Sequence, residues 1–411
     1  MEQTDVAIIG AGPAGSIAAA LLCRYGHQVT VVEQAHFPRF SIGESLLPQS
    51  MTFITEAGML DAVENAGFQH KNGAAFVRNG ATVAFDFRKK FSPGPGTTFQ
   101  VQRAAFDQLL AQEAMHQGVT IHFGQRIEQL DYDDEDNPRL HIRDNNGATR
   151  ELSSRYVLDA SGFGRVLPRL LDLETPSTMP ARASVFTHIE DHISDHHYDR
   201  DKILIAIHPE SRDVWYWLIP FSNGRCSLGV VAASGFFDVA NNEPDRLLKD
   251  TIAACPDFAQ LLINARFDTK VNMINGYACN VKSLWGKHFA LLGNAGEFLD
   301  PVFSSGVTIA MKSASLAAPL VHRYLKGEVV DWEEEYAGPL RLGVDTFRTF
   351  VNAWYDGSFQ DVIFADAKQP DIKSMIASIL AGYAWDTDNP FVRESRRRLN
   401  ALAELCRGAG R

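Results

Sequence analysis

The stretch Val6-Ala7-Ile8-Ile9-Gly10-Ala11-Gly12-Pro13-Ala14-Gly15 decides the fold of this 411-residue chain. A short apolar run typical of a buried strand passes directly into a glycine-rich turn, and residues 16–25, rich in Ala and Leu, have the composition of a helix that Gly26 closes. Residues 29–32 form a second predicted strand with Glu33 at its end. This order of elements predicts a Rossmann-like dinucleotide-binding unit at the start of an α/β protein.

The glycines of this turn have a physical task. They permit a tight bend and let backbone N–H groups approach a pyrophosphate, whose charge the N-terminus of the following helix stabilises. A carboxylate about 20 residues further on can accept hydrogen bonds from the ribose hydroxyls. We therefore expect the cofactor-binding residues of this unit to be Gly10, Gly12, Ala14, Gly15 and Glu33.

Composition excludes several classes of function. The net charge of −11 argues against a nucleic-acid-binding protein, which normally presents a basic face. Five scattered cysteines without a CxxC pair suggest neither a disulfide framework nor a zinc site, so we predict no metal. Because no window reaches about 18 uninterrupted apolar residues, we predict no membrane span and a cytoplasmic protein.

The pattern of predicted elements changes along the chain. Alternating strands at 183–189, 202–208, 214–219 and 225–231 predict an inserted antiparallel sheet. We expect a first part of the cofactor-binding domain over 1–165, the antiparallel-sheet substrate domain over 166–275, a second part of the cofactor-binding domain over 276–330, and a C-terminal helical region over 331–411.

Two further segments indicate which dinucleotide is bound. Leu158-Asp159-Ala160-Ser161-Gly162 follows a predicted strand, and Gly293-Asn294-Ala295-Gly296 follows another, with Asp300-Pro301 just after it. Together with the first turn, this pattern resembles the FAD fold of the p-hydroxybenzoate-hydroxylase type. The resemblance implies FAD as the cofactor and further FAD contacts from Arg39, Ser41, Arg103, Asp159, Gly293, Asn294, Asp300, Gly306 and Val307. Asn294 departs from the family, which usually has Asp there.

The stretch Trp215-Tyr216-Trp217-Leu218-Ile219-Pro220 matches the WxWxIP signature of flavin-dependent halogenases, a family of secondary metabolism. Gly43-Glu44-Ser45-Leu46-Leu47-Pro48 resembles the family's segment after the second strand, and Gly67–Ala74 carries Lys71 where the family places its catalytic lysine. Asp300–Val307 resembles the halide-side flavin loop of the phenol- and pyrrole-type members. The matches run from about residue 5 to 325.

The resemblance implies a reaction in which reduced FAD and oxygen form a C4a-hydroperoxide, a halide converts it to hypohalous acid, and a lysine directs that oxidant at an electron-rich aromatic ring. Lys71 would be the catalytic residue, and Ser305 and Gly306 would bind the halide. Alternate side chains of a strand share one face. Trp215 and Trp217 would therefore form a flat wall that, with Phe303, bounds the passage from flavin to substrate.

Departures from the family narrow the substrate. Tryptophan-type members have a glutamate where this chain has Phe303, so we expect a phenolic or pyrrolic substrate, either free or tethered to a carrier protein. No second GxGxxG is present, which favours a separate flavin reductase over stable NAD(P)H binding.

Other interpretations stay open. Paired indoles are more often core packing, and a single lysine is more often a solvated surface residue. Asn294, and Val214 in place of the usual Gly, are compatible with a non-halogenating FAD-dependent monooxygenase, or with a dehydrogenase or reductase of the same fold. A flavin-binding protein without turnover is a third possibility, because fold and motif do not determine chemistry.

Overall fold

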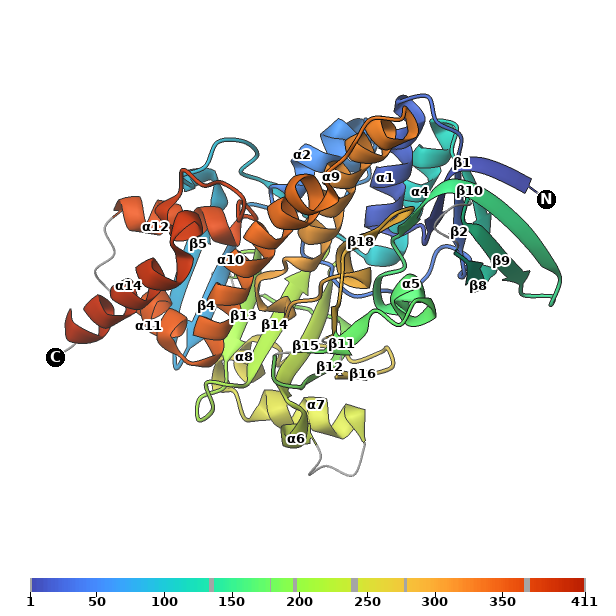
Figure 1. The fold of residues 1–411 in the computed structure, drawn as a ribbon. Coiled ribbons are helices and arrows are strands. Elements are labelled where there is room, and N and C mark those ends of the chain that lie inside the picture. Colours follow the sequence, from blue (N-terminus) through green and yellow to red (C-terminus); the bar gives the residue numbers. More distant parts are fainter. Residues whose placement is uncertain are drawn as a thin grey trace.

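The structure is a computed structural model that describes residues 2–132, 137–177, 179–194, 198–237, 243–276, 279–365 and 370–409. Two large sheets lie next to each other, and C-terminal helices pack on the side of the second sheet that faces away from the N-terminus (Figure 1). The two ends of the chain lie at opposite ends of the molecule (Figure 1). Among the described residues, no helix combines the length and apolar character that crossing a membrane requires.

The first sheet has a parallel core in the order β7-β2-β1-β10-β19, as the Rossmann-like prediction requires. Short β18 pairs with β19, and a hairpin of β8 and β9 extends β10, in both cases antiparallel. The strands are β1 (Glu2–Ile9), β2 (Val29–Glu33), β7 (Thr120–Phe123), β8 (Gln125–Asp131), β9 (Arg139–Asp144), β10 (Thr149–Asp159), β18 (Trp285–Gly286) and β19 (Phe289–Leu291).

Helix α1 (Pro13–Arg24) begins where the glycine turn ends, because Pro13 takes its first position and has no N–H to leave unpaired. It packs between α4 (Arg103–His116) and the long α9 (Gly306–Leu325), and its apolar residues join the main hydrophobic core. Gly26, with φ of +86°, follows its C-terminus as predicted. The N-terminus of α9 lies after the third predicted cofactor segment.

The second sheet has the order β16-β12-β15-β14-β13-β4-β5 and contains the four predicted strands. It also extends beyond residues 166–275, because β4 and β5 join its edge and β4 runs parallel to β13. The strands are β4 (Gly73–Arg78), β5 (Ala81–Asp86), β12 (Arg182–Glu190), β13 (Lys202–Ile207), β14 (Trp215–Pro220), β15 (Arg225–Ala233) and β16 (Asn272–Asn275).

The two faces of the second sheet belong to different cores. Trp215 and Trp217 join the core shared with the first sheet, while Tyr216 and Leu218 point into a separate core. That separate core includes apolar residues of α6 (Ser234–Phe237), α7 (Pro244–Ala253) and α8 (Pro256–Leu261). The chain forms α7 and α8 as two separate helices, since Pro256 cannot continue a helix from the preceding turn.

The remaining elements are two short pairs of strands, three helices in the first half of the chain and a C-terminal group of helices. The strand pairs are β3 (Gln69–Lys71) with β6 (Thr98–Gln100), and β11 (Glu174–Pro176) with β17 (Cys279–Val281). The helices are α2 (Ser50–Glu56), α3 (Leu60–Asn65), α5 (Val166–Leu170), α10 (Gly338–Tyr355), α11 (Ser358–Phe364), α12 (Pro370–Leu380), α13 (Pro390–Arg393) and α14 (Ser395–Ala409).

Candidate functional site

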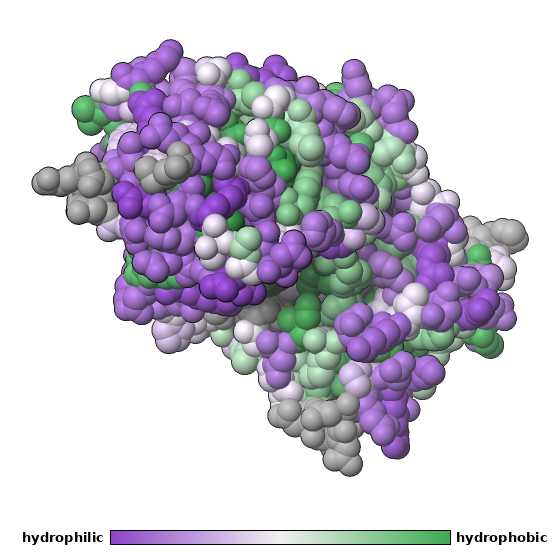
Figure 2. All heavy atoms as spheres, turned by 90° about the vertical axis from the view of Figure 1, so that its right-hand side faces the viewer, coloured by the Kyte–Doolittle hydropathy of each residue, from purple (hydrophilic) through white to green (hydrophobic). Residues whose placement is uncertain are grey.

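A cavity of about 700 Å³ lies between the two sheets, and we call it the cofactor cavity. Its walls come from the turn between β1 and α1, the end of β2, the loop 39–45, the turn 160–164, the face of β14, and the N-terminus of α9. Parts of β8 and α5 also line it. Figure 2, which views the molecule from the right-hand side of Figure 1, shows a hollow edged by hydrophobic residues.

The glycine turn leaves no space for side chains. A Cβ at Gly10 would lie 2.7 Å from the carbonyl oxygen of Ala160, and one at Gly15 would lie 1.9 Å from the carbonyl oxygen of Gly10. Gly10 also has φ of +95°, which L side chains rarely adopt. No side chain caps the N-terminus of α1, and its first turn has no acidic residue. Its positive end is therefore available to an anion in the cavity.

Glu33 is buried at the edge of the cofactor cavity and holds the turn in place. Its Oε2 accepts a hydrogen bond from the backbone N–H of Ala11 at 2.8 Å, and its Oε1 accepts one from Ala35 at 2.9 Å. Because each carboxylate oxygen can accept more than one hydrogen bond, Glu33 can still receive ribose hydroxyls.

The two predicted arginines, Arg39 and Arg103, share one carboxylate. Asp107 is fully buried and accepts two hydrogen bonds from Arg103, at 2.7 and 2.9 Å, and its Oδ2 lies 3.0 Å from Nη1 of Arg39. Arg103 also donates to the carbonyl oxygen of Ile42. Asp107 therefore positions both arginines along the cavity wall, a role that the sequence analysis did not assign.

A second helix N-terminus faces the far end of the cofactor cavity. Gly306 and Val307 open α9 and line the cavity, and no side chain caps this end. Ser304, with φ of +57°, turns the chain into the helix. Asn294 lies beside this turn, and its carbonyl oxygen accepts a hydrogen bond from Arg165 at 3.2 Å. Two helix dipoles thus point their positive ends at the same cavity.

Trp215 and Trp217 both line the cofactor cavity, with ring centroids 6.0 Å apart. Their planes differ by 47°, so they do not form the flat wall that we expected. Different partners explain the tilt. Trp217 donates to the hydroxyl of Ser227 at 3.0 Å and lies over Gly229, whereas Trp215 donates to the hydroxyl of Tyr355 at 2.9 Å.

Lys71 is fully buried on β3 and does not line the cofactor cavity. Its Nζ donates to the hydroxyl of Ser45 and to the carbonyl oxygen of Leu46, both at 2.7 Å. Burial lowers the pKa of Lys71 from 10.5 to about 7, because the charged form loses its hydration. Ser45 itself lines the cavity, so one residue separates the Lys71 amine from it.

The structure brings most of the predicted residues to the cofactor cavity. Those that line it are Gly10, Gly12, Ala14, Glu33, Arg39, Ser41, Arg103, Trp215, Trp217, Asn294, Gly306 and Val307. Those that do not line it are Gly15, Lys71, Asp159, Gly293, Asp300, Phe303 and Ser305.

Three of the residues that do not line the cofactor cavity have structural roles. Asp159 is fully buried and accepts hydrogen bonds from the backbone N–H groups of Ser161 and Leu167, and burial raises its pKa. It therefore shapes the turn 160–164 from behind. Asp300 accepts a hydrogen bond from the N–H of Val302 and lines a second cavity, of about 280 Å³. Phe303 packs edge-on against aromatic residues of the C-terminal helices instead of facing the cavity.

Four side chains near the two cavities could not be identified from the sequence, because they come from distant parts of the chain. They are Asp107 beneath the arginines, His188 beside Glu44, Arg182 in the second cavity, and Tyr355 on Trp215. None stands in a recognisable motif, and only folding brings each beside its partner. Within the part of the chain that the structure describes, no group of three or more His, Cys, Asp or Glu side chains could hold a metal ion.

Comparisons with known proteins agree with this geometry. The FAD binding domain family matches residues 3–273. A tryptophan 2-halogenase from Chondromyces crocatus is 31% identical over 80% of the chain, which spans 63% of that protein's length. A 1H-pyrrole-2-carbonyl-[peptidyl-carrier protein] chlorinase from Pseudomonas fluorescens is 26% identical, with 97% of this chain and 94% of the chlorinase covered. A flavoprotein/dehydrogenase structure from Cytophaga hutchinsonii is 43% identical over both full chains, with a TM-score of 0.96.

Proposed function

Since the chain belongs to the flavin-dependent halogenase family of FAD-dependent oxidoreductases, we propose that it halogenates an electron-rich aromatic ring. The overall reaction converts an aryl C–H bond, a halide, O₂, anionic reduced FAD and two protons into an aryl–halogen bond, oxidised FAD and two molecules of water. FAD, when bound, would supply the two electrons that activate oxygen towards the halide. The protein's own residues must hold the cofactor and the halide and direct the oxidant.

Residues of the cofactor cavity are suited to FAD. The N-terminus of α1 would stabilise the pyrophosphate, and Glu33 would accept the ribose hydroxyls. The uncapped N-terminus of α9 would stabilise negative charge at the flavin end, where the N–H groups of Gly306 and Val307 are candidates for holding a halide. Ser305 lies behind them and would contribute to the shape of the turn.

The observation that carries the proposal is the state of Lys71. With a pKa of about 7 and two hydrogen bonds from its Nζ, the side chain is poised to be a neutral amine with a free lone pair. A neutral amine can be a nucleophile or accept a hydrogen bond from hypohalous acid, whereas an ammonium ion can do neither. Ser45 would set the direction of that lone pair while separating Lys71 from the flavin.

For the substrate we propose a phenolic or pyrrolic ring, either free or linked to a carrier protein. Support comes from Phe303, which stands where a tryptophan-type enzyme has a glutamate, and from the pyrrole-carrier chlorinase, which the chain covers almost completely. The similarity to a tryptophan 2-halogenase makes free tryptophan the substrate to test against it.

The proposal is tested by mixing the reduced enzyme with oxygen, bromide and a panel of rings: a phenol, a pyrrole, a carrier-linked pyrrole and tryptophan. We expect a product with the two-isotope pattern of bromine by mass spectrometry, formed from a phenol or a pyrrole and dependent on enzyme. Absence of bromination and chlorination across the whole panel, with FAD bound and reoxidised, would rule halogenation out. Bromination of tryptophan alone would correct the substrate class.

A second candidate is a dehydrogenase or reductase without halogenation. The Cytophaga hutchinsonii protein, which is similar over the whole chain, is described as a flavoprotein/dehydrogenase. Rapid reduction of bound FAD by NADPH, without a partner protein, would favour this candidate. Reduction that requires an added flavin reductase would favour the halogenase, which we propose depends on such a partner.

A further inference from the structure

Glu44 and His188 form a buried pair at the edge of the cofactor cavity. The Glu44 side chain is 4% exposed and lines the cavity, and its Oε1 accepts a hydrogen bond from Nε2 of His188 at 2.8 Å. Its other oxygen, Oε2, makes no hydrogen bond to any residue that the structure describes. One end of the carboxylate is thus held by the imidazole, and the other is available to a molecule in the cavity.

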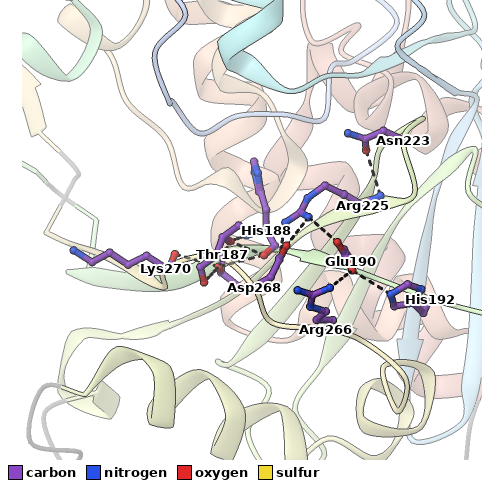
Figure 3. Close-up of polar contacts among 10 residues, drawn as sticks. Thr187, His188, Glu190, His192, Asn223, Arg225, Arg266, Asp268 and Lys270 are labelled. Carbon is purple, nitrogen blue, oxygen red and sulfur yellow. Dashed lines mark hydrogen bonds and ion pairs between the residues drawn. The ribbon is translucent and has the colours of Figure 1, made fainter.

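His188 reaches this position from β12. Arg182, Ser184, Phe186 and His188 alternate along one face of that strand, and Ser184 lines the cavity. Figure 3 shows the His188 side chain pointing away from the charged residues at the end of the strand. It is 18% exposed and packs between the rings of Phe40 and Phe221. The imidazole is therefore more exposed than the Glu44 carboxylate.

The charged groups around the pair are neutralised by their own partners. Beside Glu44, Arg103 and Arg39 both bind Asp107.

Beside His188, Arg225 binds Asp268 and lies 3.7 Å from Glu190 (Figure 3). Lys270, on the neighbouring loop, extends its side chain away from His188 (Figure 3), and its backbone carbonyl oxygen accepts a hydrogen bond from the hydroxyl of Thr187. Among the described residues, His188 Nε2 is the hydrogen-bond donor that reaches the Glu44 carboxylate.

We propose that Glu44 and His188 are a proton-transfer pair that connects solvent with the cofactor cavity. The inference rests on FAD binding but not on halogenation. Reduced FAD is an anion at neutral pH, and its reoxidation by O₂ yields FAD and hydrogen peroxide with uptake of one proton. Glu44 lines the cavity, so its free oxygen is placed to deliver that proton.

The transfer has two steps and moves no electrons. First, the other ring nitrogen, Nδ1 of His188, accepts a proton from a hydronium ion, which leaves as water, while the N–H bond at Nε2 breaks and an O–H bond forms on Glu44. Rotation of the ring then returns an N–H group to the side that faces Glu44. Second, that O–H bond breaks and an O–H bond forms on the reduced oxygen species in the cavity. Glu44 is the group that touches the cavity, and His188 is a positioning residue that acts through it.

The test measures recovery of flavin absorbance after reduced enzyme is mixed with oxygenated buffer, without halide or aromatic substrate. Glu44→Gln keeps a hydrogen-bonding side chain but carries no transferable acid proton, and we expect it to slow recovery about 100-fold. His188→Ala should be slowed similarly and should regain speed when imidazole is added, because the partly exposed site admits it. Glu190→Gln and His192→Ala, at the exposed end of the same strand, are matched controls that should recover at the wild-type rate.

A second readout does not depend on turnover. In protein labelled with ¹⁵N-histidine, before and after FAD is added, one ring should show a hydrogen-bonded Nε2–H that shifts in Glu44→Gln and is absent in His188→Ala. Recovery within about twofold of wild type in Glu44→Gln, no rescue of His188→Ala by imidazole while FAD affinity is intact, or no such ring in the ¹⁵N spectrum would each overturn the proposal. Failure of halogenation alone would leave this result unchanged and would bear on the proposed function instead.

Discussion

The cofactor cavity and the surroundings of Lys71 lie on either side of the loop 43–48 and are built in opposite ways. The cavity is open space bounded by backbone turns, glycines and two uncapped helix N-termini. Lys71 is enclosed by side chains, and its amine is satisfied by Ser45 and Leu46. Adjacent residues of one loop serve the two regions, since Glu44 faces His188 and Ser45 faces Lys71.

The difference separates binding from reactivity. A cavity lined by N–H dipoles stabilises an anionic cofactor without moving any charged side chain. A lysine kept from water has its pKa lowered to about 7, which makes it reactive at neutral pH at a cost in stability. Changes in the first region should therefore alter FAD affinity, and changes in the second should alter chemistry and pH dependence.

The largest expected effect comes from Lys71→Met. We expect halogenated product to fall about 1000-fold, within the range for a positioned reactive group, while FAD affinity and reoxidation by oxygen stay at wild-type values. Product analysis by mass spectrometry and flavin absorbance measure the two separately. Lys312→Met is the matched control, because burial also lowers the pKa of Lys312 but its amine lies over the rings of Phe53 and Trp385 instead of beside Ser45. Unchanged product yield would remove Lys71 from its proposed role.

Stability should respond to pH through the same lysine. Below pH 7, Lys71 is charged in both the folded and the unfolded chain. The folded state then bears the full free-energy cost of burying that charge. Between pH 7 and 10.5 only the unfolded chain stays protonated, so the folded state gains about 5 kcal/mol across this window relative to Lys71→Met. Urea unfolding of both proteins at several pH values measures the gain. A difference that does not vary with pH would contradict the lowered pKa.

A change in the glycine turn of the cofactor cavity should affect FAD binding alone. In Gly15→Ala the new Cβ would lie 1.9 Å from the carbonyl oxygen of Gly10 and force the turn to move. A strain of about 1–3 kcal/mol would weaken FAD binding about 10- to 100-fold, as measured by flavin fluorescence titration. Gly235→Ala is the control, because nothing lies within 4 Å of its added Cβ. Equal affinity in both variants would mean that this turn does not contact FAD.

The smallest expected effect concerns the boundary between the regions. Trp215→Phe removes the hydrogen bond to the hydroxyl of Tyr355, a loss of about 1 kcal/mol in unfolding free energy. Trp285→Phe, which removes an exposed hydrogen bond to Glu333, should cost less. Thermal unfolding compares the two variants. If Trp285→Phe lowered the unfolding free energy as much as Trp215→Phe, the hydrogen bond between β14 and the C-terminal helices would not contribute to stability as described.

The contrast also explains what the sequence could predict. The cofactor cavity was predictable because its parts are local: the turn around Gly10, the end of β2 and the start of α9 each lie within one short segment. Their separation along the chain did not matter, since parallel strands end at the same edge of a sheet.

The surroundings of Lys71 and Trp215 were less predictable, because long-range packing determines them. Phe303 was expected at a passage and instead packs against the C-terminal helices, which carry no motif that would have placed them there. The pairing of Glu44 with His188 joins residues from two different parts of the fold. The tilt of the two indoles depends on hydroxyl groups that strand periodicity does not identify.

A crystal structure with FAD and bromide tests the central claim most directly, since that claim is a flavin in the cofactor cavity joined to Lys71 past Ser45. We predict the flavin ring beside the N-terminus of α9, bromide at the N–H groups of Gly306 and Val307, and a continuous path from there to the Lys71 amine. Bromide bound elsewhere, or a wall between the flavin and Lys71 that stays closed with both ligands present, would contradict the account.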